Sequence, residues 1–583
     1  MSQQENNNME KHFYRASAAD FNKIPGSPIA YWVSQNLFNI FKKRQGLVSD
    51  LSKSEGKNVT TNNAKFVKFF WEVNCTDIGT FDKNWLPCAM GGDYRKWYGN
   101  IIHVIDWSPN ARSFYRSAPA GRIIRKEFWP LPGITWGKIG SAAASFRFLS
   151  KDEMYQETAI LQNTESDSIF LLALLNSKVT NHFLKFLSPT VNFQLEDIYA
   201  IPTIEINQLK KITEENITKA INIAKKDWGS SEQTRDFTIF QLLDDRVKDP
   251  LLKISFQKLR SQWSTVTLEL KKIEEENNLI FINAYNLKEE LSTEVPLSEI
   301  TLICNPHYRY GSNKTEEELD AMLQGDTMAE LISYTIGCMM GRYSLDREGV
   351  VYAHGNNEGF KTLTEEGAYT SFPADRDGIL PLTSEAWFED DIATRVEEFV
   401  RTVWGAEHLE ENLQFIADSL CLAAIKPVKK GGETSRETIR RYLSTQFFKD
   451  HLKTYKKRPI YWLFSSGKEK AFECLVYLHR YNETTLPRMR TEYVTPLLGQ
   501  MDSRIERLRL QQNEAETAEA KRIGKEIDSL TKQLTELRSF DDQLKHYADM
   551  KIPLNLDDGV KVNYGKFGTL LAEVKAITGD KAE

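Results

Sequence analysis

The stretch GGDYRKWYGN occupies residues 91–100 and combines a Gly-Gly pair, two cations, three aromatic side chains and an asparagine. It lies among short runs of β-branched and aromatic residues, such as KFVKFFWEV, IIHVIDW, GRIIRKEFW and SFRFL, which alternate with Gly, Pro and Asn turns. This alternation is typical of short strands joined by tight turns. Residues 51–205 are therefore predicted to form a mixed, mostly β domain.

The sequence on either side of this domain has helical patterns. Residues 1–50 predict a polar linker and an amphipathic helix, and residues 206–300, which are rich in Lys and Glu, predict a helical spacer. Residues 301–495 predict an α-rich domain. In residues 496–583, apolar residues recur in steps of three and four on both sides of an Ala/Glu-rich middle, which favours either a helical hairpin or a coiled coil with a stutter. The predicted fold class is α+β multidomain.

Composition narrows the class of protein. The 583 residues carry a net charge of -6, with 41% hydrophobic and 27% charged residues, as in globular proteins. The six cysteines are scattered without a C-x-x-C pair, which indicates a reducing cytoplasm and no zinc ribbon. The sequence has no apolar run approaching the length of a membrane span and no signal-peptide pattern at its start. No metal-ligating residue is assigned.

Positive charge is concentrated around the opening stretch. The segment from Cys88 to Ser150 contains nine cations and three anions, in a chain whose total charge is negative. Such a basic segment, interleaved with tryptophan and tyrosine, suits phosphate neutralisation and base reading in DNA. The alternative is a solvated basic face around an aromatic core. The cations are Arg95, Lys96, Arg112, Arg116, Arg122, Arg125, Lys126, Lys138 and Arg147.

The segment ICNPHYRYG, residues 303–311, is one residue away from the Asn-Pro-Pro-Tyr signature of DNA adenine-N6 methyltransferases. In that signature the Asn holds the adenine amino group and the aromatic ring stacks on the flipped base. However, His307 replaces the second proline, and we find no Gly-rich cofactor turn upstream of Asn305. We therefore predict a strand end and turn that Asn305-Pro306 initiates and Gly311 ends. The catalytic interpretation is the alternative.

Two other functions are alternatives, a nuclease and a protein that binds other subunits. A nuclease needs clustered carboxylates, for which PADRDG (373–378) and LDDGVK (556–561) are the nearest matches, and both favour Asp-Gly turns. An interaction protein would use the helices of 206–550 to bind other subunits, with DNA contact incidental. A concave basic surface would favour DNA over this second function.

Several longer motifs occur in an order that resembles a known family. They are GSPIAYW (26–32), TNNAKFVKFFWEV (61–73), GGDYRKWYGN with VIDW (104–107), GITWGKI (133–139), LLALLNSKV (171–179) and PTVNFQLEDI (189–198). Over residues 12 to 567 the chain resembles the C-terminal half of the PglX family, the adenine-specific DNA methyltransferases of BREX-1 phage defence. The resemblance implies that residues 1–50 join a missing catalytic half. It also implies that S-adenosylmethionine is a cofactor of the complete protein and not of this chain, which alone is expected to be inactive.

The resemblance and the basic segment together predict double-stranded DNA as a partner. A separate methyltransferase catalytic half and other BREX subunits are further expected partners, and no membrane is expected. In the loop 91–100 we expect Arg95, Lys96 and Asn100 to face DNA and at least one aromatic ring to point inward, with a turn cap as the alternative role of Asn100. The predicted DNA-binding residues are Lys65, Arg95, Lys96, Tyr98, Asn100, Arg122, Arg125, Lys126, Trp136 and Asn192. No catalytic or cofactor-binding residue is assigned.

Overall fold

The structure is a computed structural model that describes residues 21–22, 24, 33–43, 46–137, 143–156, 159–188, 192–203, 206–311, 313–428 and 432–579. The GSPIAYW motif and Lys138 lie outside these residues. The chain divides into two compact units. Unit 1 contains Met1–Val67, Gly79–Trp228 and Gln262–Asn313, and unit 2 contains Lys68–Ile78, Gly229–Ser261 and Lys314–Glu583. The segments predicted at 51–205, 206–300 and 301–495 each contribute to both units.

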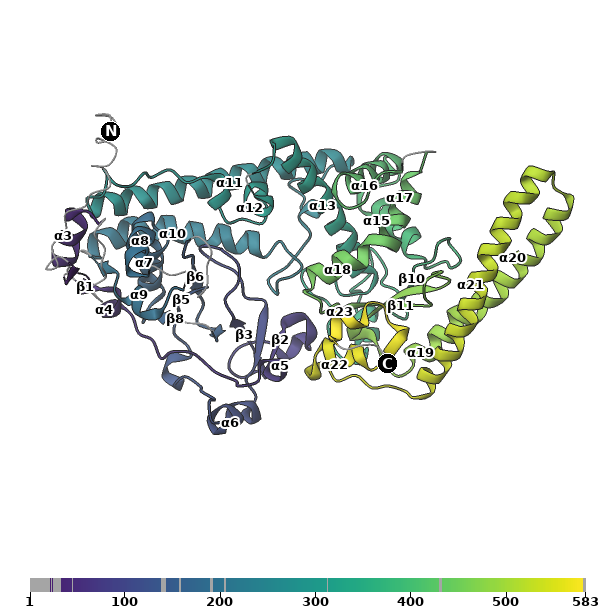
Figure 1. Ribbon diagram of the computed structural model, residues 1–583, viewed down its shortest axis with the longest axis horizontal. Helices are drawn as coiled ribbons and strands as arrows, with labels where there is room; N and C mark the ends of the chain where they lie inside the picture. Colours follow the sequence, from purple (N-terminus) through teal and green to yellow (C-terminus); the bar gives the residue numbers. More distant parts are fainter. Residues whose placement is uncertain are drawn as a thin grey trace, which may run out of the picture. The chain divides into compact units, whose positions relative to one another are not determined.

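Unit 1 contains small sheets and many helices (Figure 1). In one sheet, β3 (Trp85–Ala89) pairs antiparallel with β4 (His103–Asp106) and parallel with β7 (Met154–Tyr155). In another, β5 (Gly133–Trp136) lies between β6 (Phe146–Leu149) and β8 (Ala159–Leu161). A two-stranded sheet joins β1 (Gly46–Leu47) to β9 (Pro202–Thr203). The strand β2 (Val67–Phe69) begins at the last residue of a unit 1 segment and continues into unit 2.

The helices within unit 1 begin where the sequence supplies caps. The hydroxyl of Thr164 accepts from the amide of Asp167 at the start of α7, and Ser177 does the same at α8. The helices are α3 (Gln35–Lys43), α4 (Val48–Leu51), α5 (Asn63–Phe66), α6 (Pro109–Ser117), α7 (Glu165–Leu175), α8 (Lys178–Leu187), α9 (Leu195–Tyr199), α10 (Ile206–Trp228) and α12 (Pro306–Tyr310).

The long helix α11 (Leu252–Ala284) belongs to unit 2 up to Ser261 and to unit 1 from Gln262. Its unit 1 portion buries Leu270, Ile273 and Phe281 in the same core as the apolar face of α7. The helix predicted in the Lys/Glu-rich region is therefore present, and one of its faces lies inside unit 1.

Unit 2 combines a three-stranded sheet with most of the remaining helices. The strand β12 (Glu473–Tyr477) lies between β10 (Ile379–Pro381) and β11 (Tyr461–Ser465), antiparallel to both. The helix α13 (Glu316–Met339) begins with a Thr315–Glu318 capping box and is buried along most of its length, as its apolar sequence predicts. The others are α14 (Phe360–Glu365), α15 (Ile392–Trp404), α16 (Leu409–Ala423), α17 (Ser435–Tyr442), α18 (Phe448–Thr454), α19 (Thr485–Arg488), α22 (Val560–Gly565) and α23 (Val574–Thr578).

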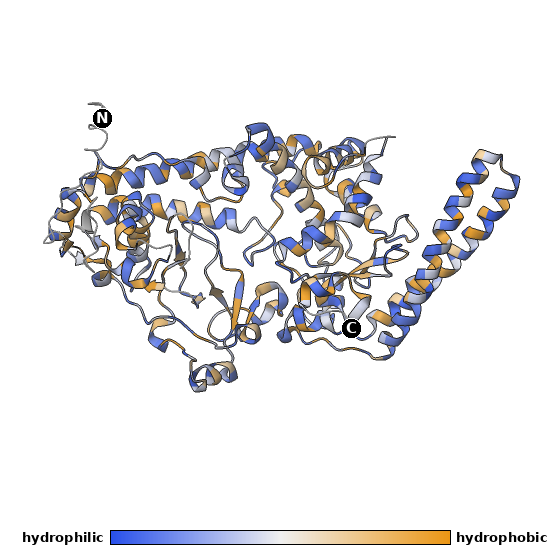
Figure 2. Ribbon diagram, viewed as in Figure 1, coloured by the Kyte–Doolittle hydropathy of each residue, from blue (hydrophilic) through white to orange (hydrophobic). Residues whose placement is uncertain are grey.

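The periodic segment near the C-terminus is a helical hairpin. The helices α20 (Thr495–Glu514) and α21 (Thr517–Asp549) lie side by side, and the chain reverses in the Ala/Glu-rich middle (Figure 1). Figure 2 shows apolar and polar residues alternating along both helices. Met501 and Ile505 of the first helix and Leu534 and Leu537 of the second share one apolar core. The hairpin is thus confirmed over the stuttered coiled coil.

These observations confirm the predicted α+β class. Among the described residues, no helix combines the length and the apolarity needed to cross a membrane.

Leu537→Ala should lower the free energy of unfolding of the hairpin by about 2–5 kcal/mol, because the side chain is fully buried and its removal leaves a cavity. Leu510→Ala, on the same hairpin but 66% exposed, is the matched control and should change it by less than about 0.5 kcal/mol. Urea-dependent hydrogen exchange of the α20 and α21 amides measures both. Equal losses in the two variants would contradict the observed helix pairing.

Candidate nucleic-acid interface

The first cation of the opening stretch lies in the interior of unit 1. The Arg95 side chain is 2% exposed, and its Nη2 donates to Oδ2 of Asp227, at the end of α10, over 2.8 Å. Its Nε donates to the Tyr98 carbonyl at 2.8 Å, and the guanidinium lies 4.8 Å from the ring centre of Trp228. Arg95 therefore joins its own loop to the C-terminal end of α10.

The second cation is buried in the same way. Lys96 is 5% exposed, and its ammonium forms an ion pair with Glu274 of α11. The other carboxylate oxygen of Glu274 accepts from Nε1 of Trp97 at 2.8 Å. Burial acts to lower the pKa of Lys96, but the Glu274 carboxylate beside it raises that pKa above the ordinary lysine value. The lysine is therefore charged, and its ammonium pairs with Glu274 in the interior and not with a group at the surface.

The expectation that Arg95 and Lys96 face DNA is corrected by this burial. Removing a cation from water is costly unless a partner charge lies beside it, and the partners of Arg95 and Lys96 lie 132 and 178 residues further along the chain. The expectation that at least one aromatic ring points inward is confirmed, because Trp97 is fully buried. The prediction that Tyr98 binds DNA is wrong, because this residue is only 4% exposed and its hydroxyl donates to Glu153 at 3.1 Å.

Asn100 has the turn-cap role that was its alternative. Its Nδ2 donates to the Asp93 carbonyl at 2.9 Å, and its φ is +60°. A Cβ on Gly92, whose φ is +127°, would lie 2.7 Å from the Asn100 amide, so the turn requires glycine there.

Four further predicted residues divide between interior and surface. Nε1 of Trp136 donates to the Phe193 carbonyl at 3.0 Å, so this buried ring has a structural contact and does not face solvent. Lys65 and Asn192 are exposed, and Lys65 lies over the ring of Phe66. Arg122 is exposed and donates to the Glu55 carbonyl.

The remaining two predicted residues, Arg125 and Lys126, line a hollow together with Arg112 and Arg116. The hollow has a volume of about 490 Å³, and Pro109, Ile123, Ile124 and Trp129 complete its lining. A concave surface with four cations is what phosphate groups require.

Local structure explains how the four cations meet. Ser108 caps α6 and Pro109 occupies its first turn, so that Arg112 and Arg116 lie one turn apart on the same face. Arg125 and Lys126 follow on the turn that begins the short helix Lys126–Phe128. Arg112 and Arg116 were counted as cations but not chosen as site residues, although their spacing on a capped helix is visible in the sequence.

Arg112 is the most constrained of the four. Its guanidinium lies 5.6 Å from the ring centre of Trp129. Its buried Nε has no acceptor among the described residues. Arg125, by contrast, is 63% exposed and pairs with Glu55 at 2.6 Å and Glu127 at 3.1 Å. The hollow thus contains one pre-oriented arginine and several adaptable cations.

Asn305, the candidate methyltransferase asparagine, caps a helix. Its Nδ2 donates to the carbonyls of Leu297 and Ile300, both at 2.8 Å, and its Oδ1 accepts from the His307 amide. Pro306 opens the short helix α12 and Gly311 ends it. The predicted structural role of Asn305 and Gly311 is confirmed, but the segment is a short helix and not the predicted strand end and turn. Because the side-chain amide is used by the backbone, the segment does not fit an adenine-binding loop.

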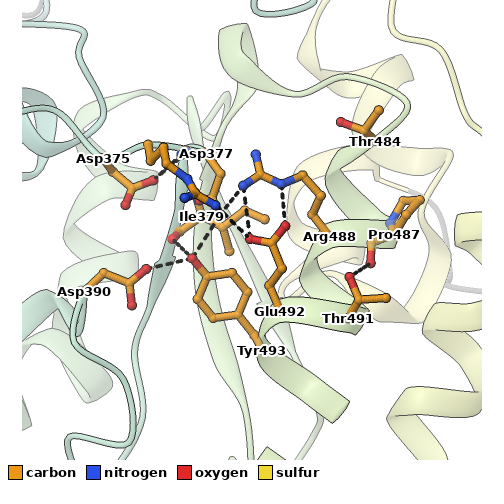
Figure 3. A network of polar contacts seen from close by, with 12 residues as sticks. Asp375, Asp377, Ile379, Asp390, Thr484, Pro487, Arg488, Thr491, Glu492 and Tyr493 are labelled. Atoms are coloured by element: carbon orange, nitrogen blue, oxygen red, sulfur yellow. Dashed lines mark hydrogen bonds and ion pairs between the residues drawn. The ribbon is translucent and has the colours of Figure 1, made fainter. Parts of the chain in front are cut away.

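The two aspartate-rich segments form the predicted Asp-Gly turns. Oδ1 of Asp375 accepts from the amides of Asp377 and Gly378, at 2.9 and 2.6 Å. In Figure 3, the Tyr493 hydroxyl lies within hydrogen-bond distance of two carboxylates, 2.7 Å from Asp390 and 3.1 Å from Asp377. The other segment forms a turn that ends at Gly559, with a φ of +83°. Across the described ranges, no three His, Cys, Asp or Glu side chains converge as metal ligands would.

Arg95→Met should lower the free energy of unfolding of unit 1 by about 3–5 kcal/mol, because it leaves the Asp227 carboxylate buried without its cation. Arg125→Met, at an exposed ion pair, is the control and should cost less than about 1 kcal/mol. Urea unfolding of both variants measures the two changes in the free energy of unfolding. A stable Arg95→Met protein would show that the ion pair is dispensable.

Asp377→Asn should weaken the pH dependence of unit 2 stability. Burial, followed by the nearby Asp375 carboxylate, raises the pKa of Asp377 from 3.8 to about 7. Between these values the folded state binds more protons than the unfolded state, so the unfolding free energy falls as pH rises. Denaturation of the wild type and the variant across this window measures the difference. Asp502→Asn, at an exposed site, should leave the slope unchanged, and an unchanged slope for Asp377→Asn would refute the assignment.

Comparison with known proteins gives relatives that extend along almost the whole chain. No family model matches. The chain is 47% identical over 571 residues to the adenine-specific methyltransferase BrxX of Escherichia coli O9:H4 (strain HS), a match that covers 97% of this chain and 46% of the relative. It is 34% identical over 580 residues to the adenine-specific methyltransferase PglX of Lacticaseibacillus casei (strain Zhang), with 95% and 45% covered. The chain is thus closely similar to two adenine-specific methyltransferases, and it spans slightly less than half the length of each.

Proposed function

We propose that the chain is the DNA-recognition and docking portion of a BREX-type adenine-N6 DNA methyltransferase, and that it corresponds to the C-terminal half of the PglX family. The observation that carries this proposal is the hollow of four cations in unit 1, in a chain similar to adenine-specific methyltransferases over 97% of its length. Phosphate oxygens would lie against Arg112, Arg116, Arg125 and Lys126. These contacts fix the position of a duplex without reading its sequence.

The geometry of the hollow supports this assignment. Stacking of Arg112 on Trp129 holds the guanidinium in place before DNA arrives, which reduces the entropy lost on binding. The exposed side chains of Arg125 and Lys126 can follow the backbone of any sequence. Base reading would fall to exposed predicted residues such as Lys65 and Asn192, since Arg95, Lys96 and Trp136 are committed to the interior.

Methyl transfer would belong to a separate catalytic part, in the same protein or in a partner chain. In the described residues, the only near-match to the methyltransferase signature uses its asparagine as a helix cap. We therefore assign S-adenosylmethionine to the complete enzyme and derive no step of the transfer from this chain. Docking to that catalytic part and to other BREX subunits is included in the proposed role.

A non-catalytic interaction protein is the second candidate function. The observation that favours it is a set of exposed apolar side chains on the long helices of unit 1. Ile212 of α10 is 57% exposed, and Leu268 and Leu279 of α11 are 55% and 48% exposed. Exposed apolar side chains of this size suit contact with another protein.

Arg112→Ala, Arg116→Ala and Lys126→Ala should each weaken duplex binding by similar factors for every sequence. Each loss of a phosphate contact should reduce the slope of log affinity against log salt by about 1. Fluorescence anisotropy with several labelled duplexes across a salt series measures both quantities. Lys361→Ala is the control, because that side chain is 90% exposed and lies in unit 2. Affinity that is independent of salt, or unchanged in all three variants, would favour the interaction protein.

A further inference from the structure

Unit 2 contains a partly open cavity, separate from the cationic hollow of unit 1. Its volume is about 240 Å³. Aromatic and aliphatic side chains form one part of its lining and two arginines another; those that matter here are Phe70, Trp71, Cys75, Arg235, Arg342 and Val350. All of them belong to unit 2.

Arg342 is the unusual member of this lining, because its side chain is 1% exposed and has incomplete hydrogen bonding. Its Nε donates to the Tyr343 hydroxyl at 3.2 Å and its Nη1 to the Tyr477 hydroxyl at 3.0 Å. Within the part of the chain that the structure describes, these two tyrosine hydroxyls are the acceptors of the Arg342 side chain, and Nη2 has none. Buried cations are normally neutralised by a partner charge.

Two other arginines of unit 2 have acceptors of a different kind, which are amide and backbone oxygens for Arg480 and a carboxylate for Arg440. Arg480, also 1% exposed, donates from all three nitrogen atoms, to Asn357 and to the carbonyls of Asp375 and Arg376. Arg440 forms a bidentate contact with the buried carboxylate of Asp391. Arg342 has an acceptor for only two of its three nitrogen atoms, and it lines the cavity.

The carboxylates near Arg342 are poor counter-ions. Glu232 accepts from the Ser333 hydroxyl, and burial raises its pKa to about 7, which disfavours the charged form of this carboxyl. Asp236 is exposed and lies 3.7 Å from Arg235. The positive charge of Arg342 therefore faces the cavity without a matching internal charge.

The apolar wall is held in place before any ligand arrives. Trp71 stacks on Phe69 with 4.6 Å between ring centres, and its Nε1 donates to the Arg458 carbonyl at 3.0 Å. The amide of Cys75 donates to the Ala353 carbonyl at 3.0 Å. These contacts join the wall to the rest of unit 2, which favours a preformed binding site.

We propose that this cavity binds a small organic oxyanion. A carboxylate or phosphate oxygen would accept from Nη2 of Arg342, with Arg235 at the opening, and an aromatic or aliphatic body would lie against Phe70, Trp71 and Val350. The cavity would hold roughly eight waters at about 30 Å³ each, which matches a single ring with one anionic group. The proposal is independent of the DNA-binding role.

Cys75 supplies a direct readout, because its thiol lines the cavity. The full chain would be treated with N-ethylmaleimide, and the alkylation rates of Cys75 and Cys421 would be followed by mass spectrometry. Both thiols are half-buried, so Cys421 serves as an internal control. The probes are benzoate, phenyl phosphate, inorganic phosphate and the neutral analogue benzamide. We expect benzoate or phenyl phosphate to slow Cys75 alkylation several-fold and saturably, with Cys421 unchanged and benzamide inactive.

Two variants test the residues in the proposal. Arg342→Met should abolish the protection of Cys75, and Val350→Phe, which fills the cavity and keeps Arg342, should abolish it as well. The second variant covers the case in which the first does not fold. Protection of both cysteines alike, protection by benzamide, protection that survives Val350→Phe, or protection by inorganic phosphate alone would each overturn the proposal. The difference between benzoate and phenyl phosphate identifies the preferred oxyanion.

Discussion

Two buried ion pairs, Arg95 with Asp227 and Lys96 with Glu274, fix the positions at which three segments of unit 1 pack against one another. They join the loop 91–100 to the end of α10 and the middle of α11. Asp227 also accepts from the amides of Ile303 and Cys304, at 2.8 and 3.0 Å, so one carboxylate organises three segments. Buried ion pairs add little net stability compared with apolar contacts, but a mispaired arrangement would leave charges without water. Their main effect is therefore to disfavour other alignments of the loop 91–100 with α10 and α11.

Because of these ion pairs, unit 1 has two groups of cations, one buried and one at the surface. Arg95 and Lys96 are neutralised by carboxylates in the interior of unit 1. The loop 91–100 is therefore basic in sequence but does not present these two charges on the protein surface. The outward charge is carried by α6 and the following turn, where Arg112, Arg116 and Lys126 surround a hollow. The same residue types thus serve packing in one place and a candidate DNA surface a few residues later.

Unit 2 contains both a buried ion pair and buried arginines without one. Asp391 is fully buried, and it is satisfied by Arg440 and by the amides at the start of α15. Arg342 is equally buried but has only tyrosine hydroxyls as acceptors. A site that keeps a charge unmatched in the absence of ligand is suited to recognising the opposite charge.

The sequence by itself determined the features that depend on near neighbours. The helical hairpin follows from apolar steps of three and four, the cap at Asn305 from Asn-Pro, and the Asp-Gly turns from their own residues. The inward direction of Trp97 follows from its size and hydrophobicity. Each of these rests on interactions within a few residues along the chain.

Only the tertiary structure decided which cations face outward. The partners of Arg95 and Lys96 lie 132 and 178 residues away, and no local pattern connects them. The division into two units, each made of three separate segments, depends on equally distant contacts, as does the lone charge of Arg342. Burial and pairing are properties of the whole fold, because the cost of removing a charge from water depends on what the folded chain brings beside it.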